Sequence, residues 1–289
     1  MVRLRAPGPS ANLTAGRGSV PACVHLKTKR TMNRLAGKRV LVTGASSGIG
    51  AACARAFGER SANLVLVARR LSRIEALAEE IRGAHGVDAL TAPLDVTDRE
   101  AVVAFVAGLE EDGILPDVLV NNAGKARGLG KLHEGDIDDW EDMIDTNVKG
   151  LLYVSRAILP HMVARNSGHV INIGSIAGRW VYPGGNVYNA SKFAVYALTE
   201  AMNLDLVGTK VRVSSIDPGL VHTEFSEVRF HGDTERAESV YKGYTPLSAD
   251  DVADAVLYVA NTPEHVDVLD LVILPTDQRN AYVLHKEEV

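Results

Sequence analysis

The stretch Thr43-Gly44-Ala45-Ser46-Ser47-Gly48-Ile49-Gly50 joins the apolar run at 39–43 to a helical pattern over residues 48–58. Glycines between a strand and a helix let the backbone turn sharply and approach a pyrophosphate, which the helix N-terminus stabilises. A glycine-rich turn alone is weak evidence, because many such turns only reverse the chain. Its position at the first strand-to-helix turn, with another apolar run at 63–68, predicts a dinucleotide site here.

Short β-branched runs alternate with helical patterns along the rest of the chain. We expect strands at 39–43, 63–68, 88–94, 116–121, 169–174, 211–216 and 268–274, and helices at 48–58, 71–83, 98–111, 137–165, 188–207 and 249–261. Apolar strands that alternate with amphipathic helices are typical of a parallel sheet covered on both faces. The sequence therefore predicts an α/β fold: one domain with a doubly wound, mostly parallel sheet of seven strands.

Composition narrows the classes of function. The chain has 289 residues, of which 46% are hydrophobic and 23% charged, as in globular proteins with a sizeable core. No apolar run is long enough for a membrane span. Cys23 and Cys53 give neither a disulfide framework nor a metal cluster, and the histidines lack zinc-site spacing. We predict a cytoplasmic protein without a bound metal and without membrane association.

The N-terminal segment differs in charge from the rest of the chain. Residues 1–31 hold six basic and no acidic groups, so the formal charge is −5 for the whole chain and −11 without those six. A body so acidic disfavours nucleic-acid binding, which depends on neutralising phosphates. We predict that residues 1–35 form a basic, disordered extension and that residues 36–289 form the folded domain. The extension could be a tail, an organelle-targeting segment, or sequence read from an early start codon.

The end of the second strand bears on cofactor choice. It reads Val67-Ala68-Arg69-Arg70, with no carboxylate to accept hydrogen bonds from ribose hydroxyls. Two guanidinium groups suit the 2′-phosphate of NADP, because their planar donors match phosphate oxygens; an exposed surface pair is the alternative. We expect Arg69 to make the closer contact. Asp95, with Val96 behind it, is placed for the adenine amine or as a helix cap.

Tyr188 and Lys192 lie four residues apart on a predicted helix, so their side chains share one face. A free phenol titrates near ~10 and is a poor proton donor or acceptor at neutral pH. A neighbouring ammonium group favours the phenolate and lowers that pKa. The pair is a candidate for acid–base catalysis, although tyrosine and lysine at this spacing also occur by chance.

Five motifs together resemble the short-chain dehydrogenase/reductase family over residues 38 to about 275. They are Thr43-Gly44-x-x-x-Gly48-x-Gly50, Asn121-Asn122-Ala123-Gly124, the pair Asn147 and Ser175, Tyr188-x-x-x-Lys192, and Pro218-Gly219. The resemblance implies that Tyr188 is the general acid/base, that Lys192 lowers its pKa and holds the nicotinamide ribose, and that Ser175 binds the reacting oxygen. It further implies that Asn147 holds a water connecting Lys192 to solvent.

The same resemblance implies an NADP(H) site. Its residues would be Gly44, Ser46, Ser47, Gly48, Ile49, Gly50, Arg69, Arg70, Asp95, Val96, Asn122, Ala123, Gly124, Tyr188, Lys192, Pro218, Gly219, Val221 and Thr223. Hydride transfer itself is the chemistry of the nicotinamide. The predicted protein is thus an oxidoreductase, and dimers or tetramers, as found across the family, are expected.

Three segments resemble a narrower group, the NADP-dependent 3-hydroxy acid dehydrogenases, which includes serine 3-dehydrogenases. They are the segments 140–147, 184–188 and 219–230. Such enzymes act on small acids such as serine, allo-threonine or 3-hydroxypropionate, so the pocket should hold a fixed cation. Arg229 and Arg179 are the candidates, with Lys125 and Arg127 as further possibilities.

The polar segment 224–245 follows the last cofactor motif and is predicted to be a lid, which would exclude water from the site. Two alternatives stay open. One is a reductase of bulkier ketones, acyl chains or steroids, although such substrates favour a more apolar lid. The other is a non-catalytic NADP-binding scaffold, although such a protein would usually have lost the tyrosine or the lysine.

Overall fold

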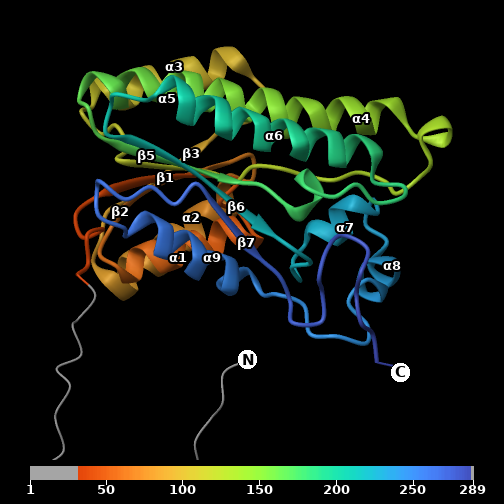
Figure 1. Ribbon diagram of the computed structural model, residues 1–289. Coiled ribbons are helices and arrows are strands. Elements are labelled where there is room, and N and C mark those ends of the chain that lie inside the picture. The colour runs from red at the N-terminus through yellow and green to blue at the C-terminus, as the bar shows by residue number, and fades with distance from the viewer. Residues whose placement is uncertain (1–31, 288–289) are drawn as a thin grey trace, which may run out of the picture. The chain divides into compact units, whose positions relative to one another are not determined.

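Seven parallel strands form one sheet within residues 32–287, which the computed structural model describes (Figure 1). Their order across the sheet is β3-β2-β1-β4-β5-β6-β7, and each neighbouring pair is parallel. The strands are β1 Arg39–Thr43, β2 Asn63–Ala68, β3 Ala89–Pro93, β4 Val118–Asn121, β5 Gly168–Ile173, β6 Val211–Pro218 and β7 Asp270–Ile273. The predicted doubly wound α/β fold is confirmed.

The two faces of the sheet bury alternate side chains of each central strand. In β1, Val40 and Val42 belong to one apolar cluster and Leu41 belongs to the other. Successive side chains of a strand point to opposite faces, so a strand covered on both sides needs apolar residues throughout. Both clusters are buried, and the sheet is therefore the middle of three layers.

Helices cover both faces of the sheet, as Figure 1 shows. One face carries α1 Gly48–Glu59, α2 Leu71–His85 and α9 Ala249–Ala260, and the other carries α3 Arg99–Glu111, α5 Leu151–Ala164 and α6 Asn186–Asp205. The helix ends follow from local chemistry. Ser248 and Asp251 form a capping box at α9, Asp98 caps α3, and Gly86 ends α2 with φ of +66°.

The predicted helix over 137–165 is interrupted. It consists of α4 Ile137–Ile144, a π-helical turn η2 Asp145–Gly150, and α5. The π turn holds Asn147, whose amide side chain is hydrogen-bonded on both sides to Lys125. Such turns place one side chain out of helical register, which the hydrophobic pattern of a sequence does not reveal.

The remaining elements are short. They are η1 Leu132–Glu134, η3 Ile176–Gly178, α7 Phe225–Arg229 and α8 Thr234–Ser239. The last two belong to the segment 224–245 that was predicted as a lid. No helix among residues 32–287 is both long enough and apolar enough to cross a membrane.

The folded domain begins earlier than residue 36. Leu35 is only 2% exposed and belongs to the core, and the backbone amide of Arg34 donates to Oδ1 of Asn261 at 2.7 Å. The prediction of a disordered extension was therefore wrong for residues 33–35, because Leu35 buries its side chain against the sheet layer. The predicted disorder of residues 1–31 concerns a part of the chain outside the described residues.

Candidate active site

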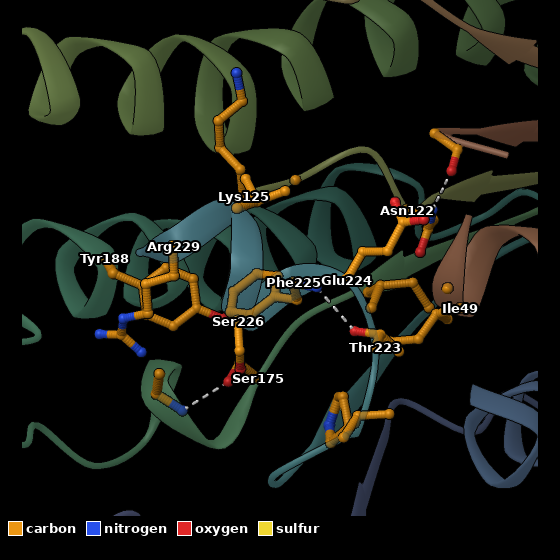
Figure 2. Close-up of a pocket in the computed structure, with 18 of the residues that line it drawn as sticks. Ile49, Asn122, Lys125, Ser175, Tyr188, Thr223, Glu224, Phe225, Ser226 and Arg229 are labelled. Atoms are coloured by element: carbon orange, nitrogen blue, oxygen red, sulfur yellow. Dashed lines mark hydrogen bonds between the residues drawn. The ribbon is translucent and has the colours of Figure 1, made fainter. Parts of the chain in front are cut away.

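A cavity of about 600 Å³ lies at the carboxyl ends of the strands. In open α/β sheets this edge, where the strand order reverses, is where ligands bind. Most of the residues predicted from the sequence line it: Gly44, Ser46, Ser47, Gly48, Ile49, Arg69, Arg70, Asp95, Val96, Asn122, Ala123, Gly124, Ser175, Tyr188, Lys192, Pro218, Gly219, Val221, Thr223 and Arg229. Figure 2 shows Tyr188 and Arg229 on one side and Ile49 and Asn122 on the other.

The glycine-rich turn is held in place by the end of β4. The Asn122 side-chain amide donates to the carbonyl oxygens of Thr43 and Gly44, and the backbone amides of Asn122 and Ala123 donate to the Thr43 hydroxyl, both at 3.0 Å. A Cβ on Gly50 would lie 2.5 Å from both the Asn122 amide nitrogen and the Gly44 carbonyl oxygen. Gly50 does not line the cavity. Its position requires glycine because the backbone of the turn and the Asn122 side chain occupy the space that a side chain would need.

The N-terminus of α1 offers hydrogen-bond donors to an anion. Ser47 is the N-cap residue, yet its side chain makes no capping hydrogen bond and instead accepts one from Arg70 at 2.7 Å. The first backbone N–H groups of a helix have no partner within the helix and attract anions together with the helix dipole. This end of the cavity fits the diphosphate of a dinucleotide.

Two arginines follow the end of β2, as predicted. Arg69 is exposed, and its closest carboxylate is that of Asp95 at 3.8 Å. Arg70 donates to the hydroxyls of both Ser46 and Ser47. Asp95 does not cap α3, because Asp98 does so; Asp95 accepts from Thr97 and lines the cavity. This arrangement leaves cationic groups beside the cavity at the position where a 2′-phosphate was predicted.

The phenol of Tyr188 and the hydroxyl of Ser175 meet deeper in the cavity. Ser175 is the N-cap of η3 and accepts a hydrogen bond from the Ala177 amide at 3.0 Å. Tyr188 lies on α6, is 7% exposed, and contacts the ring edge of Phe225 with centroids 5.7 Å apart. A buried hydroxyl pair of this kind can bind one oxygen atom of a ligand and exchange a proton with it.

Tyr188 and Lys192 are both buried on α6, and burial shifts the pKa of each. Burial raises the pKa of the Tyr188 phenol, and the hydrogen bond with Ser175 and the charge of Arg229 oppose that effect only in part. Lys192 donates to the carbonyl oxygen of Ile173 at 2.9 Å, and burial lowers its own pKa to about 8. For Tyr188, desolvation by the surrounding protein outweighs the favourable effects and favours the neutral phenol.

Asn147 lies behind the cavity and does not line it. Its Oδ1 accepts from the Lys125 amide at 2.8 Å, and its Nδ2 donates to the Lys125 carbonyl at 2.8 Å and to the Ser191 hydroxyl at 3.0 Å. Ser191 in turn donates to the carbonyl oxygen of Tyr188. The Asn147 side chain thus ties the loop after β4 to the helix that carries Tyr188 and Lys192.

Three of the four candidate cations for an acidic substrate are paired with carboxylates. Arg179 lies 2.8 Å from Asp217 and 3.0 Å from Asp270 and does not line the cavity, so its predicted substrate role was wrong. Lys125 and Arg127 line the cavity but both contact Asp142, at 2.6 and 3.1 Å. Asp217 is buried, and a buried carboxylate needs a cationic partner. Arg179 therefore points toward Asp217 and away from the cavity.

Arg229 is the remaining candidate, and no carboxylate among residues 32–287 pairs with it. Its guanidinium carbon lies 5.6 Å from the ring centroid of Tyr188, and Figure 2 shows the two side chains together. It donates to the Tyr182 hydroxyl at 2.9 Å and to the Gly128 carbonyl at 3.1 Å. These neutral partners fix the guanidinium group while leaving its charge available to an anion.

Several residues of the cavity wall were given no role in the sequence analysis, and three of them make contacts that bear on the site. Tyr182 orients Arg229, Glu224 contacts arginines at the cofactor end, and Gln278 accepts from the Leu220 amide at 3.0 Å. Tyr182 belongs to no motif. Glu224 lies in the segment 219–230 and at the start of the predicted lid, and the lid segment does form part of the cavity wall.

Comparison with known proteins agrees with this geometry. The family model described as short chain dehydrogenase matches residues 38–233. The NADP-dependent 3-hydroxy acid dehydrogenase of Salmonella typhi is 48% identical over 84% of this chain and 96% of its own length. Sulfoacetaldehyde reductase 2 of Chromohalobacter salexigens is 44% identical, over 83% of this chain and 94% of its own length.

A solved structure resembles the fold closely. The closed form of a serine dehydrogenase complexed with NADP+ superimposes with a TM-score of 0.80 at 43% identity, and the match covers 86% of this chain and all of the other. The family model spans most of the residues that line the cavity, among them Ser175, Tyr188 and Lys192. The chain therefore belongs to the short-chain dehydrogenase family.

Proposed function

We propose that this protein is an NADP-dependent oxidoreductase that transfers a hydride between nicotinamide and the 3-hydroxyl or 3-oxo carbon of a small hydroxy acid. The observation that carries the proposal is Arg229, a fixed cation beside the Tyr188 phenol without a carboxylate partner among the described residues. Relatives that are 48% identical carry the name NADP-dependent 3-hydroxy acid dehydrogenase, which supports it.

The donor groups of the cavity fit NADP(H). The α1 N-terminus would hold the diphosphate, Arg69 and Arg70 the 2′-phosphate, and Asp95 the adenine amine. Lys192, Val221 and Thr223 would hold the nicotinamide end. When bound, NADP(H) supplies the site for accepting or donating the hydride.

The chain itself would handle the proton. In reduction, Tyr188 gives the proton of its phenol to the carbonyl oxygen of the substrate, and in oxidation it takes the hydroxyl proton back. Burial keeps the Tyr188 phenol protonated, so the proton needed for reduction is present at this position. Ser175 donates a hydrogen bond to the same oxygen, where negative charge develops. Asn147 holds α6 in position through Ser191 and is a positioning residue.

Arg229 would bind the acidic group of the substrate. A guanidinium group forms two parallel hydrogen bonds with a planar carboxylate. It can also bind a sulfonate, whose oxygens carry the same single negative charge as a carboxylate. The name of the relative sulfoacetaldehyde reductase 2 makes small sulfonates a second candidate class. Bulkier ketones and steroids lack an anionic group close to the reacting carbon. Bound with that carbon beside Tyr188, they would leave Arg229 without an anionic partner.

The test is a substrate screen by absorbance at 340 nm with NADP(H), combined with one pair of variants. Serine, allo-threonine, 3-hydroxybutyrate, a sulfoacetaldehyde and a hydroxysteroid are compared. We expect turnover of the small acids. Arg229→Ala should raise their KM by about 30- to 150-fold, which corresponds to the loss of a charged hydrogen-bonded pair of about 2–3 kcal/mol. Lys242→Ala is the control, because it removes a cation from the same segment but not from the cavity wall.

Two other outcomes of the screen would contradict the proposal. Turnover of the steroid alone, or equal KM values for Arg229→Ala and the parent, would contradict the small-acid proposal. No turnover of any substrate together with tight NADPH binding would favour the scaffold alternative. The turnover screen thus tests the substrate, and the measurement of NADPH binding tests the cofactor.

We also propose that the protein works as a homo-oligomer in the cytoplasm. Helices α5 and α6 leave apolar side chains exposed, among them Leu152 and Phe193 at 39% and Leu204 at 75%. Burying such a surface against another copy is favourable. Cys53 is a free, buried thiol, which suits a reducing compartment. Light scattering of the purified protein measures the oligomeric state, where a monomer at micromolar concentration would refute the first part.

A further inference from the structure

The carboxylate of Glu224 bridges two arginines at the cofactor end of the cavity. Its Oε2 lies 3.0 Å from Nη1 of Arg70, and its Oε1 lies 2.7 Å from Nη1 of Arg73. The two guanidinium groups hold the pKa of this carboxyl below its usual range against the opposing effect of burial. Glu224 is therefore ionised at neutral pH, and it binds through both of its oxygens.

Glu224 uses the donors that an adenosine 2′-phosphate would need. Arg70 contacts Ser46 and Ser47 of the glycine-rich turn on one side and Glu224 on the other, and these four residues line the cavity. Arg73 lies one helical turn along α2 from Arg70 and shares the carboxylate. A phosphate monoester carries more negative charge than a carboxylate and offers three acceptor oxygens to the same guanidinium groups.

The pair is weak enough to be displaced. The side chains of Arg70, Arg73 and Glu224 are 44%, 48% and 39% exposed. Ion pairs at such exposure contribute little, because water competes for both partners. Competition of this kind lowers the apparent affinity for the phosphate by a small factor and leaves ligands that lack the phosphate unaffected.

We propose that Glu224 competes with the 2′-phosphate of NADP(H) for Arg70 and Arg73, and so sets a moderate cofactor affinity and a faster cofactor release. The inference rests on the proposed use of NADP(H). It assigns the first residue of the lid segment a role in cofactor specificity, together with Arg73, which does not itself line the cavity but holds Glu224 beside it. Glu224 directly precedes α7, and Arg229 is the last residue of that helix. The short helix α7 therefore links the proposed 2′-phosphate subsite at Glu224 to the proposed substrate subsite at Arg229.

The test compares Glu224→Gln with the parent protein by fluorescence titration of NADPH and NADH. We expect Glu224→Gln to bind NADPH about three- to tenfold more tightly, with NADH changed less than twofold, since only NADPH carries the contested phosphate. Stopped-flow release of NADPH should slow by a similar factor. Glu227→Gln is the matched control: it removes the same charge from α7, but its side chain does not line the cavity.

A double-mutant comparison sharpens the test. Arg73→Ala should weaken NADPH binding more in the Glu224→Gln background than in the parent, because Glu224 no longer occupies Arg73 there. Weaker or unchanged NADPH binding in Glu224→Gln, or equal tightening of NADPH and NADH, would overturn the proposal. A parent protein that binds NADH as well as NADPH would instead refute the proposed cofactor, which separates the two failures.

Discussion

At the scale of single residues, burial decides more about this site than local charge does. Tyr188 and Lys192 each sit in the cavity at 7% exposure, so the phenol holds its proton more firmly and the ammonium less firmly than in water. The spacing of the two residues predicted their shared helix face. It could not predict that Lys192 would hydrogen-bond to Ile173, because Ile173 lies on β5 and not on the helix that carries Lys192.

Tyr188→Phe should lower turnover by about 10²- to 10⁴-fold while leaving NADPH binding nearly unchanged, since it removes the proton donor and keeps the ring. Steady-state rates and fluorescence titration measure the two effects. Tyr182→Phe is an informative comparison: it removes a hydroxyl that contacts Arg229 and should raise KM rather than abolish turnover. Full activity of Tyr188→Phe would refute the proposed acid–base role.

At the scale of elements, tight turns after the strands fix the reacting groups. Gly174 follows β5 and directly precedes Ser175, and a Cβ there would lie 1.9 Å from Oδ1 of Asp217. The Asp217 side chain cannot easily move aside, because it is buried and accepts hydrogen bonds from Ser215 at 2.6 Å and from Arg179 at 2.8 Å. The Arg179–Asp217 pair thus supports the turn that carries Ser175, although Arg179 does not reach the cavity.

Gly174→Ala should destabilise the protein by about 1–3 kcal/mol through overpacking and also lower turnover by moving Ser175. Gly83→Ala in α2 is the control, because a Cβ there meets nothing within 4 Å. That change should stabilise the protein by about 0.5–1 kcal/mol, the usual gain for alanine in a helix. Urea unfolding measures both, and equal stability of the two variants would contradict the steric argument.

At the scale of the whole molecule, the closely packed sheet makes stability depend on pH. His169 lies in β5 at 1% exposure, contacts the Ser214 hydroxyl at 2.8 Å, and leaves its Nδ1 without a partner among the described residues. Burial and the charge of Arg212 hold its pKa well below the ordinary value. The folded protein therefore keeps this ring neutral when the unfolded chain would protonate it.

The free energy of unfolding should fall as the pH drops below ~6.5, by up to about 1.4 kcal/mol per pH unit from this group. His169→Gln should show a shallower decline between pH 6.5 and 5, measured by urea unfolding. Buried Asp217 and Asp267 have raised pKa values and act in the opposite direction, but they do so equally in both proteins. His265→Gln, at an exposed position, should keep the parent slope; a parallel decline in His169→Gln would contradict the assignment.

The sequence by itself determined the order of the elements and the chemistry of the site. Apolar runs set the strands of the sheet, glycines set the first turn, and Tyr188 with Lys192 lay at a fixed spacing on one helix. These are local properties, since period, turn conformation and spacing depend on neighbours in the chain. For the same reason the π-helical turn at Asn147 and the burial of Leu35 went unnoticed: each depends on a distant partner.

Only the tertiary structure decided which charges are free to bind a ligand. Arg179, Lys125 and Arg127 are neutralised by carboxylates from other elements, Glu224 reaches Arg70 and Arg73 across about 150 residues, and Arg229 is left without an acidic partner among the described residues. The physical reason is that a charge is balanced by whatever the fold places within a few ångströms of it. Sequence separation carries no information about that distance.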